Sequence, residues 1–165
     1  GMFGIIASLV FVGMQVKQTD VIASVEGQDN AVQRHFDMLS LMTEHADVWQ
    51  RGCAGEDLGA VERAQFAKIF IIYTNNNFAG WRRLEVSGYR QSKSEYNING
   101  YAANLHRYPG MAIAFRSSKE WDKLGFGDNL GPTFEKYYSL IAERVKELEE
   151  IEPNPKYGVE WCGRS

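Results

Sequence analysis

The sequence predicts an all-α protein, and three observations support that prediction. Hydrophobic residues recur at spacings of three and four along most of the 165-residue chain, which is the period of a helix with one buried face. No stretch alternates apolar and polar residues for long enough to predict a β-strand. The prolines and the glycine-containing runs 52–55 and 125–131, which favour turns and helix ends, fall at the ends of the periodic segments or between them. We therefore expect a bundle of about five helices, two of them long.

The first long helix is expected from residue 3 to residue 51. Its apolar residues after Lys17 are Val21, Val25, Val32, Phe36, Leu39, Met42 and Trp49. Their spacing has one gap near Gly27, and glycine weakens a helix interior. A break or kink near Gly27 is therefore left open. The glycine-containing run 52–55 ends the helix.

The second long helix is expected over residues 57–86, because Glu56 and Asp57 suit the positive N-terminal end of a helix. Its apolar stripe consists of Val61, Phe66, Ile69, Phe70, Tyr73, Trp81 and Leu84. A shorter helix over residues 94–107 follows. It must end before Pro109, because a proline disfavours helical backbone in the residue that precedes it.

Two further helices complete the expected bundle. Pro109 suits the first position of a helix over residues 109–123. A helix over residues 133–151 has the most regular apolar stripe of the chain, made of Phe134, Tyr137, Tyr138, Ile141, Val145, Leu148 and Ile151. We expect this last helix in the middle of the bundle or against both long helices. The tail after Pro153 is expected to be irregular and docked by its aromatic residues.

Length and charge limit the classes of function. A chain of 165 residues can bury a core without disulfides or metal ions. Its net charge of −3 argues against nucleic acid as the partner, because phosphate binding depends on clustered Lys and Arg. Cys53 and Cys162 are expected to stay reduced, and their pairing is left open.

The first sixteen residues carry no ionisable side chain. We therefore divide the chain into an apolar N-terminal helix segment, residues 2–16, and a single all-helical domain, residues 17–165. The run from residue 2 to residue 14 would extend about 20 Å as a helix, which is short against about 30 Å of bilayer hydrocarbon.

Three interpretations of the apolar segment stay open. It is the distal part of a membrane helix, or it lies in the membrane interface or packs against a second copy of the chain through residues 3–16, or it is a core helix. Lys17, Arg34 and Arg51 follow the segment and no basic residue precedes it. If the segment spans a membrane, the positive-inside rule places the main domain in the cytoplasm.

A run of three asparagines, residues 75–77, interrupts the apolar second helix. Asparagine is unfavourable inside a helix because its amide competes for backbone hydrogen bonds, so we expect at least one of these amides to need a buried partner or to line a polar cavity. The candidate ligand-binding residues are Tyr73, Asn76, Asn77, Trp81, Arg82 and Arg83. A buried amide that fixes helix register explains the same pattern and is the preferred interpretation.

No catalytic signature accompanies this candidate pocket. The three histidines are His35, His45 and His106, and the chain contains no Glu-x-x-His or His-Glu-x-x-His sequence. Gly-x-Ser-x-Gly is missing, and neither cysteine has a neighbouring histidine to activate it. We therefore assign no catalytic residue, no metal site and no cofactor, and we lean against an enzyme.

The order of several short motifs is similar to a known pattern. These are Gln15-Val16-Lys17-Gln18-Thr19, Trp49-Gln50-Arg51-Gly52, Asn76-Asn77-Phe78, Gly88-Tyr89, Pro109-Gly110, Trp121 and Pro132-Thr133-Phe134. The chain thereby resembles a family of small uncharacterised bacterial proteins with a hydrophobic N-terminal anchor helix, a Gln-aliphatic-basic-Gln-Asn/Thr step and an all-helical C-terminal domain. Its apolar segment is shorter than the typical anchor, and Thr19 stands where asparagine is commoner. The resemblance implies a membrane anchor and supplies no reaction.

Two hypotheses of function result. The first is a noncatalytic helical protein at the bacterial inner membrane, with its main domain on the cytoplasmic side, that acts as an interaction or sensing module and has a membrane lipid or membrane protein as partner. The second is a soluble cytoplasmic homodimer that binds a small ligand near Tyr73, Asn76 and Arg83, as an enzyme of unrecognised type or as a binding protein.

Overall fold

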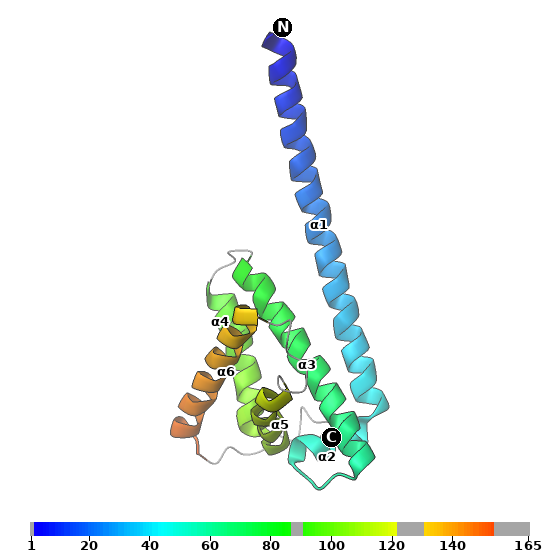
Figure 1. The fold of residues 1–165 in the computed structure, drawn as a ribbon, viewed down its shortest axis with the longest axis vertical. Helices are drawn as coiled ribbons and strands as arrows, with labels where there is room; N and C mark the ends of the chain where they lie inside the picture. The colour runs from blue at the N-terminus through cyan, green and yellow to red at the C-terminus, as the bar shows by residue number, and fades with distance from the viewer. Residues whose placement is uncertain (1, 87–90, 122–130, 154–165) are drawn as a thin grey trace. The chain divides into compact units, whose positions relative to one another are not determined.

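The structure is a computed structural model that describes residues 2–86, 91–121 and 131–153. Within these ranges it contains helices and no strand (Figure 1), so the predicted all-α class is confirmed. The helices are α1 (Met2–Glu44), α2 (Ala46–Ala54), α3 (Ala60–Val86), α4 (Gln91–Arg107), α5 (Pro109–Trp121) and α6 (Gly131–Ile151).

Contacts divide the chain into two units, residues 1–37 and residues 38–165. The first unit contains α1 from Met2 to Asp37, and its described residues are all helical. The second unit contains the end of α1 and helices α2 to α6. The boundary that the sequence suggested, between residues 16 and 17, lies inside the first unit and stays a prediction.

The single helix expected over residues 3–51 is wrong, because the chain leaves helical geometry at His45. The backbone of His45 has φ −118° and ψ 38°, and it separates α1 from α2. Gly27, where a break or kink was left open, lies inside α1. The bend at His45 starts a new helix that buries Val48 and Trp49. Burial of this short apolar face therefore decides where the first helix is broken.

Helix α2 ends at a glycine in the left-handed conformation. Gly55 has φ 75°, and its N–H donates to the carbonyl of Gly52 at 3.1 Å. The N–H of Glu56 donates to the carbonyl of Arg51 at 3.0 Å. These two bonds form a Schellman motif, which satisfies carbonyls at the helix end.

The remaining helices agree with their predicted ranges to within a few residues. Pro109 is the first residue of α5, as its fixed φ predicts. The larger differences are at the starts of α3 and α4, which were expected at residues 57 and 94 and begin at Ala60 and Gln91. Helix α3 begins later because Glu62 accepts a hydrogen bond from the N–H of Gly59 at 2.8 Å, and this contact caps the helix.

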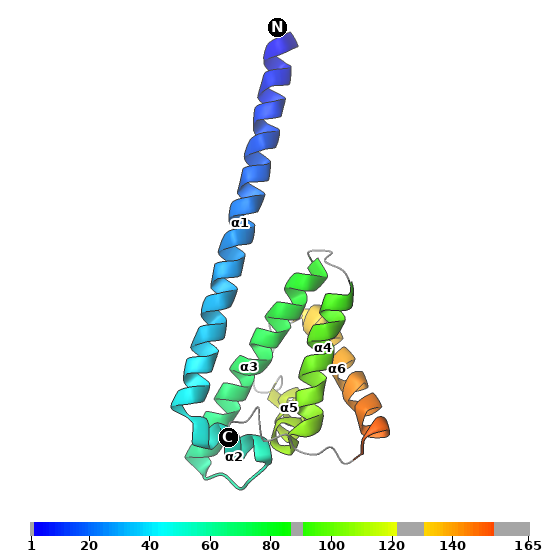
Figure 2. The same cartoon turned by 180° about the vertical axis from the view of Figure 1, so that it is seen from behind.

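Helix α4 occupies the centre of the second unit. It contacts α3, α5 and α6 (Figures 1 and 2). The expectation that the last helix would take this place or pack on both long helices is wrong. Helix α6 packs mainly on α4 and less on α3, and its buried residues, Tyr137, Tyr138 and Ile141, lie in its first half.

The core of the second unit is rich in aromatic rings. Its fully buried large side chains are Trp81, Tyr101, Tyr137, Phe70, Ile69, Leu105, Met111, Ile141 and Cys53. Tyr137 stacks on Tyr101 with ring centres 6.2 Å apart, and it meets Trp81 at 5.2 Å. These contacts join α3, α4 and α6 through one cluster of rings.

Two close approaches of α2 require a glycine, one to α5 at Gly110 and one to Phe66 of α3 at Gly52. A Cβ atom at Gly110 would overlap the carbonyl oxygen of Gly52 and lie 3.0 Å from the amide nitrogen of Gly55. A Cβ atom at Gly52 would overlap the ring of Phe66. The backbones of α2 and α5 therefore touch with no side chain between them.

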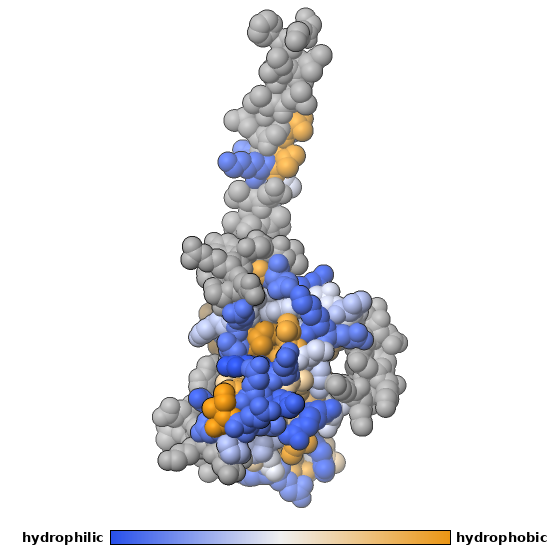
Figure 3. Space-filling model, turned by 90° about the vertical axis from the view of Figure 1, so that its left-hand side faces the viewer, coloured by the Kyte–Doolittle hydropathy of each residue, from blue (hydrophilic) through white to orange (hydrophobic). Residues whose placement is uncertain are grey.

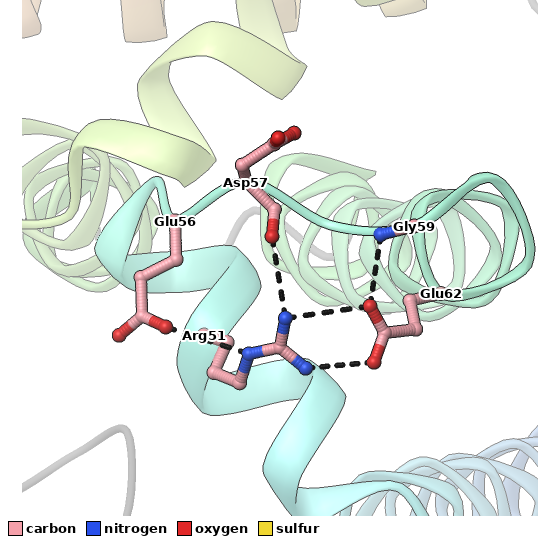
Figure 4. A network of polar contacts seen from close by, with 5 residues as sticks. All are labelled: Arg51, Glu56, Asp57, Gly59 and Glu62. Atoms are coloured by element: carbon pink, nitrogen blue, oxygen red, sulfur yellow. Dashed lines mark hydrogen bonds and ion pairs between the residues drawn. The ribbon is translucent and has the colours of Figure 1, made fainter.

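A network of hydrogen bonds and ion pairs stabilises the loop between α2 and α3 (Figure 4). Arg51 donates from Nη1 to Glu62 Oε1 at 2.7 Å and from Nη2 to the carbonyl of Asp57 at 3.2 Å. Its Nε lies 3.4 Å from Glu56 Oε2. One guanidinium thus holds two carboxylates and a loop carbonyl.

The pKa of Glu62 is lowered, first by its hydrogen bond from Arg51 and next by that from Gly59. A carboxylate with a lowered pKa stabilises the fold above its ordinary pKa of about 4.5, and this stabilisation is lost as the pH falls through the lower, folded-state pKa. We expect Glu62→Gln to lower the urea midpoint modestly at pH 7 and to reduce the loss of stability between about pH 5 and pH 3. Urea titrations followed by circular dichroism at several pH values measure both effects.

The control is Glu150→Gln, which removes an exposed carboxylate of α6. If the urea midpoint of Glu62→Gln falls between pH 5 and pH 3 as much as that of the parent chain, the Glu62 carboxylate does not stabilise the fold through this network.

Candidate functional site

An open groove of about 790 Å³ lies between α3, α4 and α6. Its residues are Trp81, Leu84, Glu85, Ser94, Glu95, Ile98, Asn99, Lys136, Leu140, Glu143, Arg144 and Glu147. Figure 3 views the side of the molecule on which α6 lies in Figure 1, and it shows hydrophobic surface between hydrophilic residues. The groove combines apolar residues with charges contributed by all three helices.

The apolar part of the groove continues into the core. Trp81 is 1% exposed and Ile98 is also buried, while Leu84 and Leu140 are half-buried. Lys136 Nζ lies 5.7 Å from the centre of the Trp81 ring, so a cation covers this indole from the solvent side. The same amine contacts Glu85 Oε1 at 2.5 Å.

The charges of the groove are mostly negative. Lys136 pairs with Glu85, and Arg144 pairs with Glu147 on the next turn of α6. Glu95 on α4 and Glu143 on α6 are both exposed and are joined by no ion pair within the described residues. Four carboxylates and two cations line the groove, which leaves an excess of negative charge.

Of the six candidate residues from the sequence, Trp81 is among the residues that line this groove. Tyr73 is buried, and its hydroxyl accepts a hydrogen bond from Asn104 Nδ2 at 2.8 Å. Arg82 and Arg83 are exposed on α3. A ligand site around Tyr73, Asn76 and Arg83 stays a prediction, and the groove itself was not predicted.

The asparagine run has structural partners. Asn75 is exposed, whereas Asn76 and Asn77 are half-buried. Asn77 Nδ2 donates to the carbonyl of Tyr73 at 2.9 Å, and Asn76 Nδ2 lies 3.5 Å from the sulfur of Met38. These contacts support the interpretation that the amides fix local packing.

A buried pair of hydroxyl groups lies beside this run and was not predicted from the sequence. Thr74 Oγ1 and the Tyr101 hydroxyl are 2.6 Å apart, and Thr74 also donates to the carbonyl of Phe70 at 2.9 Å. A periodicity argument assigns Tyr101 to the core and gives no sign of its partner. The useful signal is Thr74 itself, a polar residue on the same helix face as Phe70.

Two buried tyrosines have raised pKa values. Burial is the largest cause for both Tyr101 and Tyr137, because it disfavours the phenolate. The Tyr137 hydroxyl is buried and has no hydrogen-bond partner in the part of the chain that the structure describes. Both rings are therefore held in their neutral form inside the aromatic cluster.

The N-terminal segment presents exposed apolar residues. Val12 is 53% exposed and Val16 is 57% exposed, in the unit that contacts set apart from residues 38–165. Among the helices of the described residues, none has both the length and the apolar content needed to cross a membrane.

Residues that could hold a metal ion or form a disulfide give no further site. Within the described ranges, no three His, Cys, Asp or Glu side chains come together as a metal-binding group. Cys53 is fully buried, whereas Cys162 lies outside the described residues, so their pairing stays a prediction. The tail after residue 153, expected to dock by its aromatics, also lies outside them.

Comparisons of the chain with known protein families, with curated proteins and with solved structures find no match. The resemblance to a family of anchored bacterial proteins therefore stays an expectation drawn from short motifs. The function must therefore be inferred from the residues and contacts of this chain alone.

Proposed function

We propose that the protein is a noncatalytic interaction or sensing module that attaches to the bacterial inner membrane through residues 2–16, with the main domain, residues 17–165, on the cytoplasmic side. The observation that carries the proposal is the exposure of Val12 and Val16 in a segment without ionisable side chains. An apolar segment of this kind is stabilised when lipid removes it from water.

The residues that follow the segment suit the edge of a membrane. Gln15, Lys17, Gln18 and Thr19 are all exposed. A polar and basic stretch after an apolar helix favours the head-group region, where Lys17 meets anionic lipid. We place the apolar segment in the interfacial layer, with the amphipathic step at residues 15–19 marking its boundary with water.

Flotation with lipid vesicles tests the attachment. The full chain should float with vesicles of phosphatidylethanolamine and phosphatidylglycerol. The double variant Val12→Asp/Val16→Asp should stay in the dense fraction, because each aspartate opposes insertion into the apolar layer. The readout is the fraction of protein that rises with the vesicles.

Val61→Asp is the control, because Val61 is a valine on α3 that is even more exposed, at 72%. It should float like the parent chain. If the parent chain stays below the vesicles and elutes as a dimer from a sizing column, the membrane proposal is wrong and the soluble homodimer is favoured.

A further inference from the structure

The groove between α3, α4 and α6 has the length of a short helix. It is lined along α6 from Lys136 to Glu147, through Leu140 and Glu143. At 1.5 Å per residue, this line extends about 17 Å, or three helical turns. The facing wall comes from α4, through residues 94–99.

The interior of the groove suits an apolar helix face. Leu84, Ile98 and Leu140 present aliphatic surface, and Leu84 and Leu140 remain half-buried rather than fully covered. Amphipathic helices bind such grooves by placing apolar residues of successive turns into them. The volume of about 790 Å³ is enough for several such side chains.

The charged residues at the edge of the groove favour an occupant of positive charge. Both cations of the groove already contact a carboxylate, Lys136 with Glu85 and Arg144 with Glu147. Glu95 and Glu143 stand on α4 and α6, respectively, and their charge is not neutralised by an ion pair within the described residues. Lysine or arginine at the flanks of a bound helix would complement both walls, whereas anionic lipid would be repelled.

We propose that this groove docks an amphipathic helix of a partner protein that carries Lys or Arg on both sides of its apolar face. The proposal rests on the role as an interaction module. It does not depend on attachment to the membrane. Glu95 and Glu143 act as the two charge contacts, and Leu84, Ile98 and Leu140 receive the apolar face.

Calorimetric titration of the full chain without lipid tests the docking. The probe is a synthetic amphipathic helix with leucines on one face and lysines on both flanks. It should bind the parent chain, and a peptide with glutamate in place of each lysine should not. Glu95→Gln/Glu143→Gln should weaken binding of the lysine peptide about tenfold, and higher salt should reduce the difference.

Two further variants keep the result specific. Glu135→Gln/Glu150→Gln removes two exposed carboxylates of α6 that do not line the groove, and it should bind like the parent chain. Asn99→Arg places a bulky cation at an exposed position of the groove and should block the peptide. Equal weakening in both glutamine double variants would overturn the proposal, as would spermidine that binds as tightly as the peptide.

The docking and the membrane attachment fail separately. A chain that binds the peptide but does not float with vesicles loses only the membrane attachment. A chain that floats but binds no lysine peptide loses only the groove.

Discussion

Replacing Gly110 with alanine should destabilise the unit of residues 38–165 by about 3 kcal/mol. The new Cβ atom would overlap the carbonyl oxygen of Gly52, which is backbone and cannot rotate away as a side chain can. Helices α2 and α5 must then separate, and the packing of Trp49 and Met111 in the adjoining core is loosened. Urea unfolding followed by circular dichroism should show the loss as a lower midpoint with an unchanged slope.

Gly100→Ala provides the matched control on α4. A Cβ atom there meets nothing within 4 Å. Alanine is favoured over glycine inside a helix by about 0.5–1 kcal/mol, so this variant should be slightly more stable than the parent chain. Equal midpoints for Gly110→Ala and the parent chain would show that α2 and α5 do not touch as described.

Alkaline pH should destabilise the same unit by about 3 kcal/mol between pH 9 and pH 11. The pKa values of Tyr101 and Tyr137 are raised by burial, so both stay protonated in the folded chain while the unfolded chain ionises near pH 10. The folded state then binds more protons than the unfolded state. The contribution of these two tyrosines to stability is therefore fully present below their unfolded-state pKa of about 10, and above it stability falls by up to about 1.4 kcal/mol per pH unit for each tyrosine.

Variants separate this effect from general alkaline unfolding. Tyr137→Phe should remove about half of the loss, and at pH 7 it should leave stability unchanged or raised, because its hydroxyl has no partner among the described residues. Tyr96→Phe, at a ring 80% exposed, should leave the profile unchanged. Urea midpoints measured from pH 7 to pH 11 give all three profiles, and a Tyr137→Phe profile as steep as the parent's would contradict the argument.

Much of the secondary structure could be predicted because the sequence carries local signals for it. Pro109 marks the start of α5, and the 3–4 spacing of apolar residues marks α3 and α6. The break at His45 could not be predicted in this way, since no glycine or proline stands there and the chain bends to bury Val48 and Trp49. A tertiary contact decides that position.

The candidate site was less accessible to sequence reasoning. The sequence predicted a candidate site at the asparagine run on α3, because amides are unusual inside an apolar helix. In the structure, Asn76 and Asn77 make local contacts with Met38 and Tyr73. The groove instead combines residues about 60 positions apart, such as Trp81 and Glu143, which come together only when α3 and α6 both pack on α4. No spacing rule along one helix predicts such a surface.

The central place of α4 has a consequence for the speed of folding. Its two neighbours along the chain, α3 and α5, are also its neighbours in space. Segments 91–107 and 109–121 can therefore associate as soon as they are helical, without first closing a long loop. Contacts near in sequence favour folding in microseconds to milliseconds, so we expect the α3–α4 and α4–α5 contacts to form before the contact of α4 with α6, which must span the intervening α5.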